Sequence, residues 1–119
     1  VEQLDKKKLL VDSKKVLETK IFKDGTNISA VKIESKKAIS VLTNERGVGL
    51  THACGTGACA SVVAACKMNL VDKKVLVKML GGTIKVEISA NNHIFMIGEA
   101  SEVFEGKINL KNFNDVQKR

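Results

Sequence analysis

Most of the chain beyond residue 27 alternates between apolar and polar side chains with the period of two that is typical of β-strands. The alternation predicts six strands, the first two forming a hairpin, over residues 28–33, 38–43, 75–79, 83–88, 93–97 and 101–110. The pair Gly81-Gly82 predicts a tight turn between the third and fourth of these strands.

The segment 58–69 departs from this period, because small and apolar residues cover nearly every face that a helix would have there. It therefore predicts a helix that is buried all round. A Gly-rich loop over 44–57 precedes it, with two predicted strands before the loop and four after the helix. The pattern favours an α+β fold in which a curled antiparallel sheet wraps around a central buried helix.

Residues 1–26 are polar and weakly patterned. Asp12-Ser13 is suited to cap a short helix there, with Val16 and Leu17 as its apolar contacts. The length of 119 residues suits one domain. The chain begins at Val1 rather than Met, which we take to indicate a piece of a longer protein.

The net charge is +7, which raises the possibility of a nucleic-acid or membrane partner. The basic residues are spread along the chain, only two of the twenty are Arg, and no aromatic residues are interleaved with them as stacking platforms. We therefore expect no nucleic acid and no membrane as partners, and a non-catalytic basic binding module remains an alternative. No segment approaches the roughly 20 apolar residues of a membrane-spanning helix.

The three cysteines, Cys54, Cys59 and Cys66, lie within thirteen residues of one another. An odd number in one cluster does not indicate a disulfide framework, so a reducing, cytoplasmic compartment fits better. A zinc site is not favoured, because no C-x-x-C pair is present and His52 is a single neighbouring candidate.

Cys54 stands just before the predicted helix, in the sequence Cys-Gly-Thr-Gly. The first turn of a helix has N–H groups without partners, and together with the helix dipole they form a site for anions. A thiol at that position has its thiolate form favoured. The alternative is that Cys54 is a small buried hydrophobe. Cys59 and Cys66 lie inside the helix and are expected to be core residues, and a Cys54–His52 nucleophile pair is conceivable but not favoured.

Glu45 and Arg46 place an acid and a base next to each other at the end of a predicted strand. They are either solvated charges at a hairpin end or a site in which Arg46 binds a carboxylate and Glu45 an ammonium group. Together they would suit a zwitterionic amino acid.

Five short segments stand out: Gly-Thr-Asn at 25–27, Glu-Arg-Gly-Val-Gly at 45–49, Ala-Cys-Gly-Thr-Gly-Ala-Cys-Ala at 53–60, Leu-Gly-Gly at 80–82 and Phe-Glu-Gly at 104–106. Together they resemble segments of the diaminopimelate epimerase family, in which the turn similar to 80–82 reads Pro-Gly-Gly. The spacing of eighteen from Asn27 to Glu45 and nine from Glu45 to Cys54 is that of the family. Cys-Gly-Thr-Gly alone also resembles proline racemases.

The resemblance implies the C-terminal half of a cofactor-independent epimerase that interconverts LL- and meso-diaminopimelate, in lysine and peptidoglycan precursor biosynthesis. One cysteine thiolate removes the α-proton while a second cysteine delivers one from the opposite face, and Cys54 would be one of the two. Glu45 would contact the substrate amine and tune the cysteine. Asn27 and Arg46 would hold the distal end of the substrate.

For the α-carboxylate, the resemblance implies the backbone N–H groups of Gly55 and Thr56. It further implies that no metal, pyridoxal phosphate or nicotinamide takes part. It implies a homodimer to which Phe104 contributes, and a strand near 101–110 that pairs with the other lobe.

The chain also departs from the family pattern. It lacks the Asn-Gly-Asn-Gly-x-Arg-Cys segment of the second catalytic cysteine and the family's Asn-Pro-His segment, so we expect it to hold half an active site and to be inactive alone. Leu50 and His52 stand where the family has Glu-Thr-Leu around Thr51. A proline-racemase-like or other amino-acid racemase therefore remains an alternative, which Glu45-Arg46 disfavours.

Overall fold

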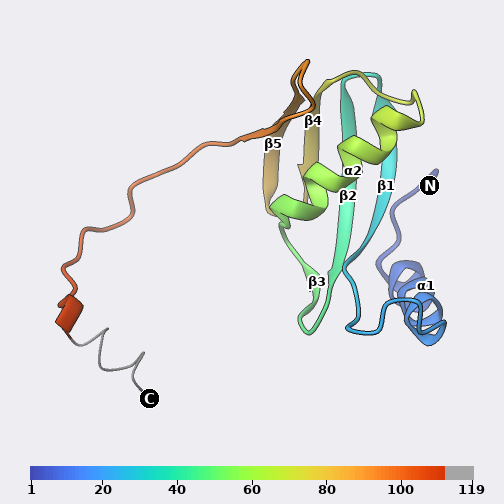
Figure 1. Ribbon diagram of the computed structural model, residues 1–119, viewed down its shortest axis with the longest axis horizontal. Helices are drawn as coiled ribbons and strands as arrows, with labels where there is room; N and C mark the ends of the chain where they lie inside the picture. Colours follow the sequence, from blue (N-terminus) through green and yellow to red (C-terminus); the bar gives the residue numbers. More distant parts are fainter. Residues whose placement is uncertain (112–119) are drawn as a thin grey trace.

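The computed structural model of the chain describes residues 1–111 and contains two helices and six strands within them (Figure 1). Their bounds are α1 Lys6–Glu18, β1 Ile28–Ser35, β2 Ala38–Glu45, β3 Gly49–Thr51, α2 Gly55–Lys67, β4 Lys74–Met79, β5 Gly82–Ile88 and β6 Ile94–Ile97. Neither helix is long and apolar enough to cross a membrane.

The strands form one curled sheet in the order β1-β2-β4-β5-β6, with the short β3 paired to β2. The prediction of a purely antiparallel sheet is wrong at one position, because β2 and β4 are parallel and align Ile39 with Val77. The reason is that α2 carries the chain from the end of β3 back across the sheet, and a helical crossover returns the next strand in the same direction. The predicted hairpin of β1 and β2 is confirmed. A tight turn joins β4 to β5 as predicted, but Leu80 and Gly81 form it, because Gly82 already pairs with Met79 as the first residue of β5.

Helix α2 lies across one face of this sheet and closes the core (Figure 1). Its buried side carries residues three and four positions apart, Ala58, Val62 and Ala65. They pack on aliphatic side chains of β2, β4 and β5, namely Ile39, Val41, Val75, Val77 and Val86. Each Å² of apolar surface buried in this contact stabilises the fold by about 25 cal/mol.

The expectation that α2 is buried all round is not confirmed for the described chain. The side chains of Thr56, Ala60, Ala64 and Lys67 are exposed along the face that points away from the sheet. The sheet covers a single side of the helix, and no other segment of residues 1–111 covers the opposite side (Figure 1).

Helix α1 is longer than expected and begins earlier. Its N-cap is Asp5, whose side chain accepts a hydrogen bond from the N–H of Lys8 at 3.0 Å, so the cap predicted at Asp12-Ser13 is wrong. Asp12 instead lies in the middle of the helix and pairs with Lys8 at 2.6 Å, while Ser13 is buried against the sheet. A run of lysines at the helix start hides the true cap, because acidic residues rather than lysines mark a first turn.

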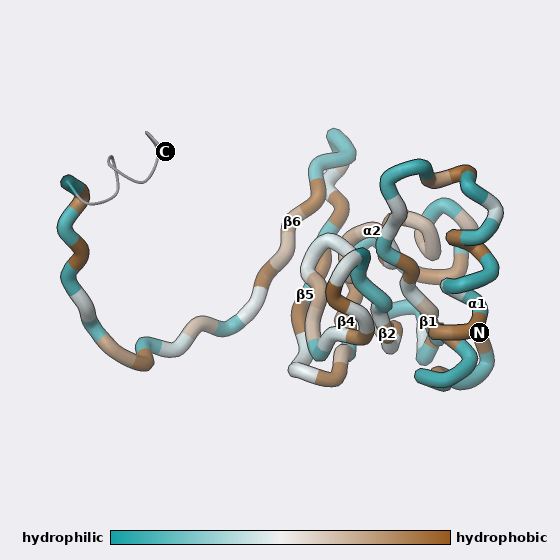
Figure 2. Tube along the Cα trace, turned by 90° about the horizontal axis from the view of Figure 1, so that it is seen from below, coloured by the Kyte–Doolittle hydropathy of each residue, from teal (hydrophilic) through white to brown (hydrophobic). Residues whose placement is uncertain are grey.

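The strand predicted over 101–110 does not form. Residues 101–109 have no helix or strand, and the segment runs away from the sheet (Figures 1 and 2). A β-strand needs a hydrogen-bonding neighbour, and no described segment lies beside this one. The last strand is therefore β6, an edge strand whose four apolar residues are all exposed (Figure 2).

Candidate active site

Cys54 is the N-cap of α2. Its backbone is extended, with φ −140° and ψ 104°, and its Sγ accepts a hydrogen bond from the N–H of Gly57 at 3.3 Å. The hydroxyl of Thr56 lies 3.5 Å from the same sulfur. The side chain is buried, with 6% of its surface exposed. The thiol thus occupies the position that a Ser or Asp side chain takes at an ordinary helix start.

Two backbone donors stand free beside this thiol. Within the described residues, the N–H groups of Gly55 and Thr56 have no hydrogen-bond partner, whereas those of Gly57 and Ala58 bond to Cys54 Sγ and to the Cys54 carbonyl oxygen. Free N–H groups at a helix N-terminus, together with the helix dipole, favour an anion. The geometry expected from the sequence is therefore present, three residues earlier than the predicted helix start.

The first turn of α2 sits directly on the sheet because residue 57 has no side chain. A Cβ at Gly57 would lie 3.0 Å from Thr43 Oγ1, 3.1 Å from Cys54 Sγ and 3.2 Å from Ser29 Oγ. The hydroxyls of Ser29 and Thr43 lie 2.8 Å apart. This contact places the thiol over the start of β1 and the end of β2.

Asn27 and Arg46 are brought together at the same end of the sheet. The Asn27 side-chain oxygen accepts the backbone N–H of Arg46 at 2.8 Å, and the Arg46 guanidinium donates to the Asp24 carbonyl oxygen at 2.8 Å. A Cβ at Gly25, which has a φ of +75°, would lie 3.0 Å from the Arg46 side chain. Asn27 therefore positions the turn, and the arginine is exposed without an acidic partner among the described residues.

Glu45 ends β2 and is half-buried. Its carbonyl oxygen accepts the N–H of Val48 at 3.1 Å in the turn to β3, where it pairs with Gly49. Among the described residues, no hydrogen bond joins the Glu45 carboxylate, Asn27 or Arg46 to Cys54. Within the described part of the chain, the polar residues predicted for the site thus share one end of the sheet without a hydrogen bond to the thiol.

His52 does not form a pair with Cys54. Its side chain is exposed, and its carbonyl oxygen accepts the N–H of Gly81 at 2.7 Å. A Cβ at Gly81 would lie 3.1 Å from that oxygen, so the turn between β4 and β5 packs tightly against the loop before α2. His52 therefore contributes its backbone to the shape of the site.

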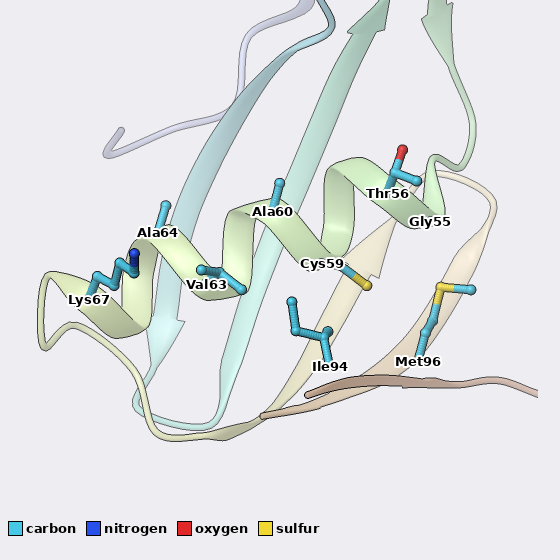
Figure 3. Close-up of a pocket in the computed structure, with 9 residues that line it drawn as sticks. All are labelled: Gly55, Thr56, Cys59, Ala60, Val63, Ala64, Lys67, Ile94 and Met96. Carbon is cyan, nitrogen blue, oxygen red and sulfur yellow. The ribbon is translucent and has the colours of Figure 1, made fainter. Parts of the chain in front are cut away.

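The other two cysteines are half-buried, so the expectation that both belong to the core is correct only in part. Cys59 lines an open apolar groove of about 650 Å³ between α2 and β6, where its side chain and those of Ile94 and Met96 face one another (Figure 3). Burial raises the pKa of the Cys59 thiol. The groove begins at Gly55, where Met96 Sδ would lie 2.9 Å from a Cβ.

Ser29 and Thr43 also lie at this site, and the alternation of the hairpin strands carries a signal for them. They are two positions along from Val31 and Val41 in the predicted hairpin, so they share the face that the helix covers.

Phe104, on the segment that follows β6, is 83% exposed.

Comparisons with known proteins agree with the resemblance seen in the sequence. The family model for diaminopimelate epimerase matches residues 1–103. The chain is 48% identical to a diaminopimelate epimerase of Clostridium perfringens, over 72% of the chain and 31% of the relative. It is 43% identical to the one of Caldanaerobacter subterraneus subsp. tengcongensis, over 81% of the chain and 35% of the relative.

Among solved structures, the chain resembles a phenazine biosynthesis protein of the PhzF family from Bacillus anthracis. The TM-score is 0.58 at 15% identity, over 80% of this chain and 30% of that one, which shows a shared fold. The chain spans about a third of the length of the curated relatives it matches. With the family model covering most of its residues, the chain belongs to the diaminopimelate epimerase family.

Proposed function

We propose that the chain forms the C-terminal lobe of a cofactor-independent epimerase that interconverts LL- and meso-diaminopimelate. The observation that carries the proposal is the thiol of Cys54 at the start of α2, beside the free N–H groups of Gly55 and Thr56. A sulfur that can exchange a proton and a site for a carboxylate are adjacent there. Those are the two requirements for removing a proton from the α-carbon of an amino acid.

The proposed reaction uses two cysteines on opposite faces of the substrate. One thiolate takes the α-hydrogen as a proton, so that an S–H bond forms and the C–H electron pair spreads onto the α-carboxylate. The N–H groups of Gly55 and Thr56 stabilise this charge. The second cysteine, as a thiol, then delivers a proton to the other face and becomes the thiolate. Cys54 has either role, depending on the direction of the reaction.

The N-terminal lobe of the same protein would supply the second cysteine. Cys59 is unsuited to that role, because it lies five positions further along α2, faces the groove beside β6, and has a raised pKa. Joining the lobes would give residues 101–110 a strand partner and wrap the sheet further around the exposed side of α2. The chain alone would then be inactive.

The substrate's distal end would bind Asn27 and Arg46, and Glu45 would contact an amine. The exposed guanidinium of Arg46 donates one hydrogen bond to the Asp24 carbonyl oxygen and has further N–H groups that can bind a carboxylate in a bidentate pair. We further propose a cytoplasmic homodimer in which Phe104 takes part, acting in lysine and peptidoglycan precursor biosynthesis. A proline-racemase-like specificity is the second candidate, since Cys-Gly-Thr-Gly fits both, but the Glu45-Arg46 pair favours a substrate with a second charged end.

The test is a chimera that joins residues 1–119 to the N-terminal part of the Clostridium perfringens relative. In heavy water the chimera is expected to introduce deuterium at the α-carbon of diaminopimelate, as followed by mass spectrometry, and to leave proline unlabelled. Labelling of proline in preference to diaminopimelate would favour the second candidate. A folded chimera that labels neither would contradict the proposed function.

A further inference from the structure

The sheet face beneath α2 changes from aliphatic to hydroxyl-bearing just where Cys54 sits. On the hairpin of β1 and β2, Val31 faces Val41, and two positions along Ser29 faces Thr43 on the same side of the sheet. Thr51 of β3 faces Thr43 in turn. The hydroxyl groups of Ser29 and Thr43 therefore take the place of valine side chains under the first turn of the helix.

The hydroxyls of Ser29 and Thr43 are close to the thiol. Ser29 Oγ, Thr43 Oγ1 and Cys54 Sγ all lie within 3.2 Å of the point where a Cβ of Gly57 would be. Thr43 is 5% exposed and bonds to Ser29 at 2.8 Å. The Thr51 Oγ1 atom is buried without a partner among residues 1–111. A polar cluster is thus retained in a buried place where valine would fill the same space.

We infer that Ser29 and Thr43 are positioning residues for Cys54. The two hydroxyls lie against Gly57, which has no side chain, and so determine how closely the first turn of α2 approaches the sheet. That distance in turn fixes the position of the Cys54 sulfur. It also replaces methyl groups by dipoles beside a sulfur that must carry a negative charge. Burying a charge among aliphatic groups alone is costly, and nearby hydroxyl dipoles reduce that cost. The inference rests on the proposed function, which requires a thiolate at Cys54.

The test compares Thr43→Val with Thr43→Ser in the 119-residue chain. The rate of alkylation of each cysteine by iodoacetamide is measured from pH 6 to pH 10 and resolved by mass spectrometry. Thr43→Val keeps the shape and loses the hydroxyl, and it is expected to slow Cys54 about three- to tenfold at pH 7. The difference should close by pH 10, because the thiolate then forms in both proteins. Thr43→Ser, which keeps the hydroxyl, should follow the unchanged chain.

Several outcomes would overturn the inference: equal rates in Thr43→Val and the unchanged chain, a reduction by the same factor at every pH, or a Cys54 that is inert throughout. Cys59 is the internal reference for general loosening, and circular dichroism reports folding. If Thr43→Val does not fold, Ser29→Ala replaces it with the same expectation. The alkylation experiment measures no catalysis, so its result is independent of the chimera. If the chimera labels diaminopimelate but Thr43→Val does not slow Cys54 alkylation, only the positioning role is overturned. If Thr43→Val slows alkylation but the chimera labels nothing, only the proposed function is overturned.

Discussion

The Sγ of Cys54 accepts the backbone N–H of Gly57 at 3.3 Å, so the thiol caps the helix that it begins. The bond fixes the sulfur with respect to the free N–H groups of Gly55 and Thr56. A thiolate accepts such a bond more strongly than a thiol does, because charge-assisted hydrogen bonds are the stronger ones. The cap therefore ties the position of the sulfur to the stability of the helix start.

Replacing Cys54 separates these two roles. Cys54→Ala removes the cap and is expected to lower the free energy of unfolding by about 0.5–2 kcal/mol. Cys54→Ser keeps an acceptor for the Gly57 N–H and should stay within about 0.5 kcal/mol of the unchanged chain. Urea denaturation of the two variants measures the difference. Equal free energies of unfolding for Cys54→Ala and Cys54→Ser would show that the side chain at this position does not cap the helix.

Gly57→Ala tests the close approach of α2 to the sheet. Alanine is the better helix former by about 1 kcal/mol, yet its Cβ would meet three atoms at 3.0–3.2 Å. We expect a net loss of about 1–3 kcal/mol in the free energy of unfolding, because the first turn of α2 must move away from the sheet to make room for the Cβ. Gly106→Ala is the matched control, since its Cβ would meet nothing closer than 3.6 Å. A stabilised Gly57→Ala would contradict this packing.

Asn27 is expected to act on the site through the turn that carries Arg46. Asn27→Ala removes the acceptor for the Arg46 N–H, so that amide should exchange with solvent at least about tenfold faster, a loss of roughly 1.4 kcal/mol of protection. Asn27→Asp keeps the acceptor oxygen and should preserve the protection. Amide hydrogen exchange followed by NMR measures both variants. Unchanged exchange in Asn27→Ala would remove Asn27 from this role.

Cys59 should respond to pH in the manner of a buried thiol. Burial raises its pKa above the ordinary value of 9.0, so its alkylation should keep rising at a pH where a free thiol has already levelled off. Because the pKa of Cys59 is raised in the folded chain, its protonated thiol contributes to the free energy of unfolding below the unfolded pKa. This contribution is lost as the pH rises through the folded pKa. Alkylation in denaturant should restore ordinary behaviour. A Cys59 that titrates like a free thiol while folded would contradict its burial.

The sequence was sufficient to predict the hairpin of β1 and β2, the strands β4 to β6 and a helix after Cys54, but not the cap of α1 or the short strand β3. Period-two alternation located both strands of the hairpin, and Cys-Gly-Thr-Gly before an apolar segment located the start of a helix. It did not predict that the helix begins at Gly55, because glycine disfavours helices by propensity. The close contact between Gly57 and Thr43 favours glycine there, and that contact exists only in the folded chain.

The remaining errors also depend on packing between distant segments. The parallel pairing of β2 with β4 depends on where α2 places the returning chain. The segment 101–110 has the alternation of a strand, but alternation supplies no hydrogen-bonding neighbour. The open side of α2 could not be foreseen, because small residues such as Ala60 and Ala64 suit a buried and an exposed surface equally.

The most direct test of the central claim is the exchange of the substrate α-hydrogen by the chimera with Cys54 changed to serine. Deuterium incorporation into diaminopimelate is compared for the chimera, Cys54→Ser and the matched control Cys66→Ser. Because Cys54→Ser keeps the helix cap, a loss of activity reports chemistry rather than folding. We predict a loss of about a thousandfold or more for Cys54→Ser and nearly full activity for Cys66→Ser. A Cys54→Ser chimera that labels the substrate within about tenfold of the parent would contradict Cys54 as a catalytic base.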